Sequence, residues 1–272
     1  MDILNLAIST VPIAQSVEYS CVLFNNWSGV NHPIDYGNVA GTAHWTPPVL
    51  LAHSKFADLW SHGDMASPGI ENVAETGSTF TLQTEIEVLQ TKGLAGDMVI
   101  GSNQFNARDP PQVFENITLG PNFPYLSAIS MMGPSPDWFS GLSSFCPRGP
   151  GGFWFQSFEI ATYPFDAGTE QGDTYSINNN PESPHGPIFQ LTKDTVPESG
   201  ILLDPTGTKV LPVMTWKCAL TIDTNEEEET LLSGEELGLM EESNPFRSEH
   251  RIGDNGRKET NGGLRGLREN DN

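Results

Sequence analysis

The stretch GFWFQSFEIATYPFDAGTEQG, Gly152–Gly172, joins an aromatic strand to a glycine-containing turn that carries acids. In an extended chain, successive side chains point to opposite faces of a sheet. Both faces are apolar here, because Phe153 and Phe155 fall on one face and Trp154 on the other. The pattern predicts a strand over Gly152–Ala161 that is buried on both sides.

Acids on two loops form the most informative polar pattern. Asp166 and Glu170 lie four residues apart in the turn after the strand, and Asp137 follows an apolar run and two prolines in MMGPSPDWF, Met131–Phe139. Few positive charges lie nearby in sequence, and carboxylate oxygens are the ligands that calcium prefers. These three carboxylates therefore suggest a site for a hard cation. The alternative is that the aspartates cap turns, as aspartate often does.

The remaining chain predicts an all-β fold. Its 27 glycines and 21 prolines favour many short strands over long helices. Strands at this spacing are typical of an antiparallel β-sandwich with short helical excursions. Further strands are expected over Val17–Phe24, Met98–Ile100, Val113–Leu119, Tyr125–Met132, Ile188–Thr192 and Val210–Ile222.

Three segments interrupt the strands. Leu82 and Ile86 have helical spacing and predict a short helix over Phe80–Thr91. The apolar spacing of Leu50–Trp60 fits either a short helix or an irregular packed loop. Met65–Gly77 is rich in small and turn-forming residues, so we expect a connection there.

The sequence divides into three parts. Residues 17–222 form the predicted domain. Residues 1–16 are an N-terminal segment that would suit the remnant of a signal peptide, although Asp2 stands where positive charge is expected. Residues 223–272 carry 14 acidic and 6 basic residues and few apolar ones, which predicts an acidic, disordered tail.

The charge restricts the partners. The formal net charge is −22, whereas nucleic-acid binding needs clustered Lys and Arg. An anionic membrane would also repel the chain unless a cation mediated the contact. No apolar run approaches the roughly 20 residues of a membrane span.

Cysteines, tryptophans and sequons add weaker signals. Cys21 and Cys218 lie in the first and last predicted strands, so a disulfide between them is feasible if these strands are neighbours, and two buried free thiols are the alternative. Cys146 is then the unpaired one. The six tryptophans are expected to pack in the core, with a carbohydrate-stacking surface as the alternative. Two glycosylation sequons occur, at Asn26 and Asn116, which matter only in a eukaryotic secretory pathway.

Several strings, in this order, resemble the spondin domain shared by F-spondin and mindin. Together they span most of residues 17–222. They are FNNWS (Phe24–Ser28) followed by His32-Pro33, AHWTPP (Ala43–Pro48) followed by His53-Ser54, LWSHGDMASPGIENVAETG (Leu59–Gly77), MMGPSPDWFSGL (Met131–Leu142) and YPFDAGTEQGDTY (Tyr163–Tyr175).

The resemblance implies a β-sandwich, an extracellular adhesion role and a bound calcium on one set of loops. The family's calcium ligands fall on Asp137, Asp166 and Glu170 of this chain. Glu170 departs from the family pattern, which has Asp there, and calcium tolerates the extra methylene because its coordination is flexible.

Three functions remain open from the sequence. The first is a secreted calcium-binding spondin-domain protein that recognises a matrix or cell-surface protein or a glycan. The second is a hydrolase acting on extracellular polysaccharide, with Asp137 or Glu170 catalytic. The third is a structural matrix module whose calcium only stabilises it. We expect a protein that is not an enzyme, since no G-x-S-x-G, HExxH or P-loop motif is present.

Overall fold

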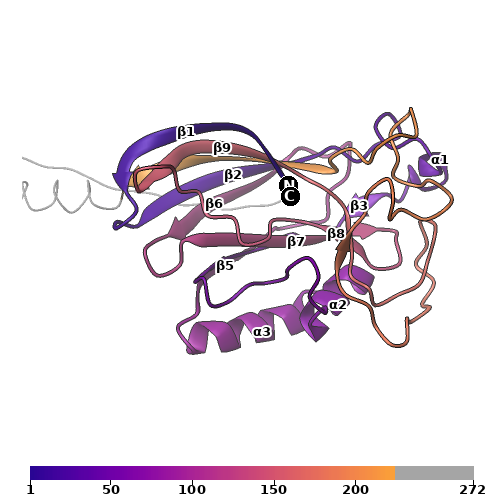
Figure 1. Ribbon diagram of the computed structural model, residues 1–272, viewed down its shortest axis with the longest axis horizontal. Coiled ribbons are helices and arrows are strands. Elements are labelled where there is room, and N and C mark those ends of the chain that lie inside the picture. Colours follow the sequence, from indigo (N-terminus) through magenta and orange to yellow (C-terminus); the bar gives the residue numbers. More distant parts are fainter. Residues whose placement is uncertain (224–272) are drawn as a thin grey trace, which may run out of the picture. The chain divides into compact units, whose positions relative to one another are not determined.

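A computed structural model of the protein describes residues 1–223. In these residues two antiparallel sheets pack face to face, and two helices cover the outer face of one sheet (Figure 1). The predicted β-sandwich is thus confirmed, with an added helical layer. The acidic segment after Asp223, which we expect to be disordered, lies outside the described residues.

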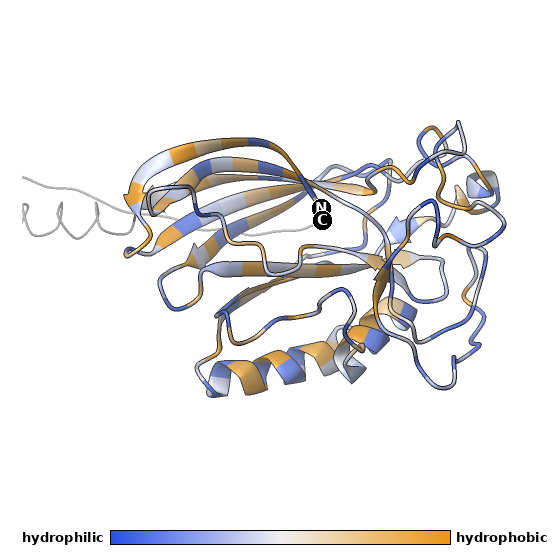
Figure 2. Cartoon of the chain, viewed as in Figure 1, coloured by the Kyte–Doolittle hydropathy of each residue, from blue (hydrophilic) through white to orange (hydrophobic). Residues whose placement is uncertain are grey.

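The first sheet has five strands, and every neighbouring pair in it is antiparallel. Hydrophobic and hydrophilic residues alternate along several of its strands (Figure 2). Its order is β1 (Asp2–Pro12), β9 (Phe153–Thr162), β12 (Met214–Asp223), β2 (Val17–Asn25) and β6 (Gln112–Leu119). The N-terminal segment, which we set apart from the domain, therefore contributes an edge strand.

The second sheet has seven strands and carries the acidic loops. Its main path runs β11 (Phe189–Gln190), β10 (Phe165–Asp166), β8 (Trp138–Ser140), β7 (Tyr125–Gly133), β4 (Val49–His53) and β5 (Ala95–Ile100). The seventh strand, β3 (His44–Trp45), pairs with β7 off this path.

Two hydrophobic cores hold the layers together. The core between the sheets buries five tryptophans at 0–1% exposure, which confirms their packing role: Trp27, Trp45, Trp138, Trp154 and Trp216. The second core lies between the seven-stranded sheet and the helices α2 (Pro68–Thr76) and α3 (Phe80–Thr91). Because β4 lies between both cores, all five of its residues are buried.

One of the three helices in residues 1–223 lies where the sequence predicts it. α3 spans the predicted residues, with Leu82 and Ile86 buried. α2 replaces the connection expected over 65–77. Ser67 caps it by accepting a hydrogen bond from the amide of Ile70, and Gly77 ends it in the left-handed conformation. A short helix, α1 (Tyr36–Val39), was also not predicted.

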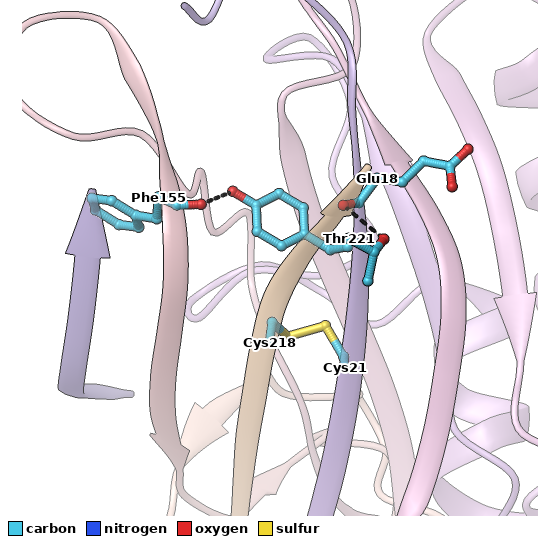
Figure 3. Close-up of a disulfide and its surroundings, with 6 residues drawn as sticks. Glu18, Cys21, Phe155, Cys218 and Thr221 are labelled. Carbon is cyan, nitrogen blue, oxygen red and sulfur yellow. Dashed lines mark hydrogen bonds between the residues drawn. A yellow bond between two sulfur atoms is a disulfide. The ribbon is translucent and has the colours of Figure 1, made fainter. Parts of the chain in front are cut away.

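A disulfide joins Cys21 of β2 to Cys218 of β12 (Figure 3). The two residues are direct cross-strand partners, with Cα atoms 4.0 Å apart. The hydroxyl of Thr221 donates to the Glu18 carbonyl between the same two strands. Cys146 is the free cysteine of the described residues and is partly exposed. Of the two alternatives from the sequence, the structure has the disulfide.

Candidate functional site

Strand pairing brings Asp137 and Asp166 together. Asp137 immediately precedes β8, Asp166 ends β10, and Asp166 is the cross-strand partner of Trp138. Beyond the pair, the amide of Ala167 donates to the Asp137 carbonyl over 3.2 Å. Two acids that are 29 positions apart in sequence therefore lie at the same end of one sheet.

Asp137 is fully buried, and its two carboxylate oxygens have different surroundings. Its Oδ2 accepts hydrogen bonds from the Thr169 amide (2.7 Å), the Thr169 hydroxyl (3.2 Å) and the Glu170 amide (3.1 Å). Its Oδ1 is buried and has no hydrogen-bond partner in the described chain. A buried carboxylate oxygen without a donor is costly, and a hydrogen-bond donor or a cation beside Oδ1 would lower that cost.

Asp166 completes a buried pair of acids. Its Oδ1 accepts from the Gly168 amide (2.8 Å) and its Oδ2 from the Trp138 indole (3.1 Å). Burial, followed by the charge of Asp137, raises the pKa of Asp166 to about 7. Burial also raises the pKa of Asp137, although hydrogen bonds from Thr169 and Glu170 oppose this shift. A cation between the two carboxylates would relieve both effects.

Glu170 lies next to a different acid. Its side chain is buried, and its pKa is raised first by burial and then by Glu75 of α2, with Asp137 as a smaller contributor. The backbone of Asn180 donates a hydrogen bond to its carboxylate. Glu170 is thus anchored between α2 and the loop around Asn180, beside the aspartate pair.

Two further acids lie in this region, Glu75 and Glu182, and no sequence motif indicates them. Glu182 raises the pKa of both Asp137 and Asp166, and its amide donates to the Thr169 carbonyl over 2.8 Å. Glu75 raises the pKa of Glu170. Neither had a local signal, since Glu75 lies in the unpredicted helix α2 and Glu182 in an irregular loop.

The arrangement fits a cation only in part. Calcium prefers oxygen donors, and the unpartnered buried Oδ1 of Asp137 is one. The pKa of Asp166 is raised by burial and by the charge of Asp137, and a bound cation would oppose both causes. Within residues 1–223, however, no three His, Cys, Asp or Glu side chains converge closely enough to hold one ion together. The aspartate pair is formed, and the third carboxylate of the predicted set is not in place with it.

Two glycines allow the acidic turn to pack closely. Gly168 has a φ of +73°, and a Cβ there would lie 2.5 Å from the carbonyl oxygen of Gly186. A Cβ on Gly172 would lie 2.3 Å from the ring of Pro136. Both contacts exclude larger residues. Because glycine has no side chain, the turn can pack directly against the neighbouring loops.

A groove of about 530 Å³ opens beside Asp166. Asp173, Asn180 and Glu198 contribute polar and acidic groups, and Phe189 supplies an apolar wall. The loop end of the seven-stranded sheet therefore presents an acidic, partly apolar depression next to the aspartate pair.

A serine–histidine pair occurs elsewhere in the second sheet. His53 Nε2 lies 2.8 Å from the Ser127 hydroxyl, which also accepts from the Ser144 amide over 2.9 Å. His53 and Ser127 are both fully buried, and His53 lies at the wall of a depression of about 380 Å³ that Tyr125 also lines. The pair ties β4 to β7 and to the turn at Ser144.

This architecture defines a β-sandwich domain with an acidic loop end, and the chain belongs to the Spondin_N family, whose profile matches residues 17–211. Over 208 residues it is 33% identical to "Spondin-1" of Homo sapiens and of Rattus norvegicus, covering 73% of this chain and 24% of each relative. It is 29% identical to "Spondin-2" of Rattus norvegicus over 176 residues, covering 64% of this chain and 52% of that protein.

The chain therefore spans about a quarter of the length of the Spondin-1 relatives that it matches. The matched region contains both acidic loops and the groove beside them, but it begins after β1. No helix in residues 1–223 is long and apolar enough to cross a membrane.

Proposed function

We propose that this chain is an extracellular spondin domain that binds calcium at Asp137, Asp166 and Glu170 and recognises a matrix or cell-surface partner through its loop end. The unpartnered Oδ1 of the buried Asp137 is the observation that carries the calcium proposal. The Cys21–Cys218 disulfide supports the location, since disulfides persist in oxidising compartments.

Calcium in this proposal organises a surface and does no chemistry. It would cancel the repulsion between Asp137 and Asp166, and Glu170 would join them once the ion is bound. Main-chain carbonyls of the same loops and water would supply the remaining oxygens, because calcium takes six to eight. The groove beside Asp166 would then be the surface that the ion stabilises for a protein or glycan partner.

A calcium titration of thermal stability tests the site. In the Asp137→Asn variant, the side-chain oxygen can still accept from Thr169 and Glu170, while an amide replaces the unpartnered Oδ1. We expect the wild-type melting temperature to rise with calcium and that of the variant to stay constant. A calcium response that survives in Asp137→Asn would show that the assignment is wrong.

Asp204→Asn is the matched control. Asp204 also accepts hydrogen bonds from backbone amides, those of Thr208 and Lys209, but both of its oxygens have partners. Its substitution should leave the calcium response intact. A binding assay with glycans and matrix proteins, with and without chelator, then tests whether recognition depends on the ion.

A further inference from the structure

The two glycosylation sequons have different surroundings in the folded chain. The side-chain amide of Asn26 is half-buried and donates to the Thr215 hydroxyl over 2.6 Å. Asn116 is exposed, and its side chain makes no hydrogen bond in the described residues. The sequon also requires Thr118, two residues after Asn116, and the hydroxyl of Thr118 has no hydrogen-bond partner in the described residues. Asn116 thus has the free amide and the open space that a bulky modification needs.

The backbone explains why Asn116 projects from the sheet. Tyr19 pairs with Ile117 and Cys21 with Phe114, so two residues of β6 oppose one residue of β2. This is a β-bulge, and Asn116 occupies it with a φ of +58°. Asparagine tolerates this left-handed conformation better than most residues. The bulge accounts for an asparagine at this position, but it does not require a threonine two residues later.

A glycan on Asn116 would lie on an edge strand of the five-stranded sheet. β6 is an edge strand, and no described strand pairs with its outer side. It contains no Lys, Arg or Pro, and Val113 on it is 59% exposed, so its protection from pairing is limited to the exposed Glu115 and the bulge itself. An open edge of this kind can pair with a strand of another molecule.

We propose that Asn116 carries an N-linked glycan, which covers the open edge of β6. The amide nitrogen of Asn116 forms a bond to the anomeric carbon of a lipid-pyrophosphate-linked oligosaccharide. The bond from that carbon to the pyrophosphate oxygen breaks, the lipid pyrophosphate leaves, and the amide loses one proton. This inference rests on the proposed extracellular location, because the donor is met only in the secretory pathway.

The test uses the full chain, directed into a eukaryotic secretory pathway by an added leader. Peptides of the secreted protein are mapped by mass before and after peptide-N-glycosidase, which converts a glycosylated Asn to Asp. We expect the peptide containing Asn116 to carry the glycan. Thr118→Val should abolish it while keeping Asn116 in its bulge, whereas the control Ser28→Ala should leave it in place.

An unmodified Asn116 in secreted protein that contains the Cys21–Cys218 disulfide would overturn the proposal. Secreted protein in which Cys21 and Cys218 remained as thiols would count against the extracellular location, while the peptide map would still report on Asn116. Sedimentation tests the covering role, because Thr118→Val should self-associate at lower concentration than wild type. Equal self-association would mean that the glycan does not protect the edge.

Discussion

Thr169 donates to a single oxygen of Asp137 from two of its own atoms, the amide at 2.7 Å and the hydroxyl at 3.2 Å. The acidic turn therefore wraps one side of the Asp137 carboxylate and leaves Oδ1 on the other side without a donor. The next residue, Glu170, adds its amide to the same oxygen while its side chain lies beside Glu75. One turn thus both anchors Asp137 and positions a further acid near it.

We first predict that Glu170→Gln weakens calcium binding. Loss of a carboxylate ligand should cost at least the roughly tenfold in affinity typical of even indirect ligand partners. The midpoint of the calcium titration should therefore move to higher concentration. Glu182→Gln is the comparison, since Glu182 acts on both aspartates. An unchanged midpoint in Glu170→Gln together with a shifted one in Glu182→Gln would make Glu182 the third ligand.

A second prediction concerns the backbone of the acidic turn. Gly168→Ala should destabilise the domain, because the new Cβ meets the Gly186 carbonyl oxygen at 2.5 Å and the residue must keep a positive φ. Gly93→Ala is matched in conformation, with a φ of +67°, but its Cβ would meet nothing within 4 Å. Only the left-handed penalty of about 1–2 kcal/mol applies there.

Urea denaturation of the two glycine variants separates strain from crowding. Overpacking typically adds about 1–3 kcal/mol, so Gly168→Ala should lose more unfolding free energy than Gly93→Ala by that amount. Gly168→Ala should also bind calcium more weakly, because the turn that holds Asp137 is displaced. Equal losses in both variants would mean that the Gly186 loop simply moves aside.

The contrast between α2 and α3 shows what the sequence could and could not predict. α3 was found because its buried residues recur at helical spacing. α2 has the same kind of face, Ile70, Val73 and Ala74, but Pro68 and Gly69 made the segment resemble a turn. The signals for its start and its end, Ser67 and Gly77, are present in the sequence, but the small and turn-forming residues of the segment favour a connection.

β4 was missed for a different reason. It is buried on both faces because the helices cover one side of its sheet and the other sheet covers the second. Such a strand has no alternation, so it cannot be told from a helix by period. The pair of aspartates followed from the motifs, whereas Glu75 and Glu182 reach the site through tertiary contacts that no local pattern encodes.

A third prediction is that the disulfide carries a large part of the domain's stability. Cys21 and Cys218 are separated by 197 positions, and a crosslink that closes so long a loop restricts the unfolded chain strongly. The double variant Cys21→Ala/Cys218→Ala should lose about 2–5 kcal/mol of unfolding free energy. Denaturation with and without a reducing agent measures this.

Cys146→Ala distinguishes the effect of the disulfide on stability from an effect of the free thiol. Cys146 is unpaired in the described residues, so its variant should remain as sensitive to the reducing agent as the wild type. The double variant should be insensitive. If reduction left the wild type unchanged, the crosslink would contribute nothing to stability.

The last prediction is a pH dependence set by His32. This side chain is fully buried, with Nε2 at 3.1 Å from the Leu211 carbonyl and Nδ1 without a partner. Burial lowers the pKa of His32, although Leu211 and Asp204 act in the opposite direction. A proton on Nδ1 would add a buried donor with no acceptor, so the folded chain favours the neutral ring.

The direction of the pH dependence follows from which state of the chain, folded or unfolded, binds the proton more readily. Below the ordinary pKa of 6.5 the unfolded chain protonates His32 and the folded chain does not, so the unfolded state gains stability as the pH falls. Unfolding free energy should therefore decrease between about pH 7.5 and 5.5, by up to ~1.4 kcal/mol per pH unit below 6.5. Other buried groups titrate in the same range, so only a difference between variants isolates His32.

His32→Gln provides that difference. Glutamine can still donate to the Leu211 carbonyl, but it does not titrate and removes the unpartnered Nδ1. Urea denaturation at pH 7.5 and 5.5 should show a smaller loss of unfolding free energy in this variant than in wild type. The exposed His62→Gln should follow the wild type. Parallel pH curves for wild type and His32→Gln would mean that folding does not change the pKa of His32, and would contradict the prediction.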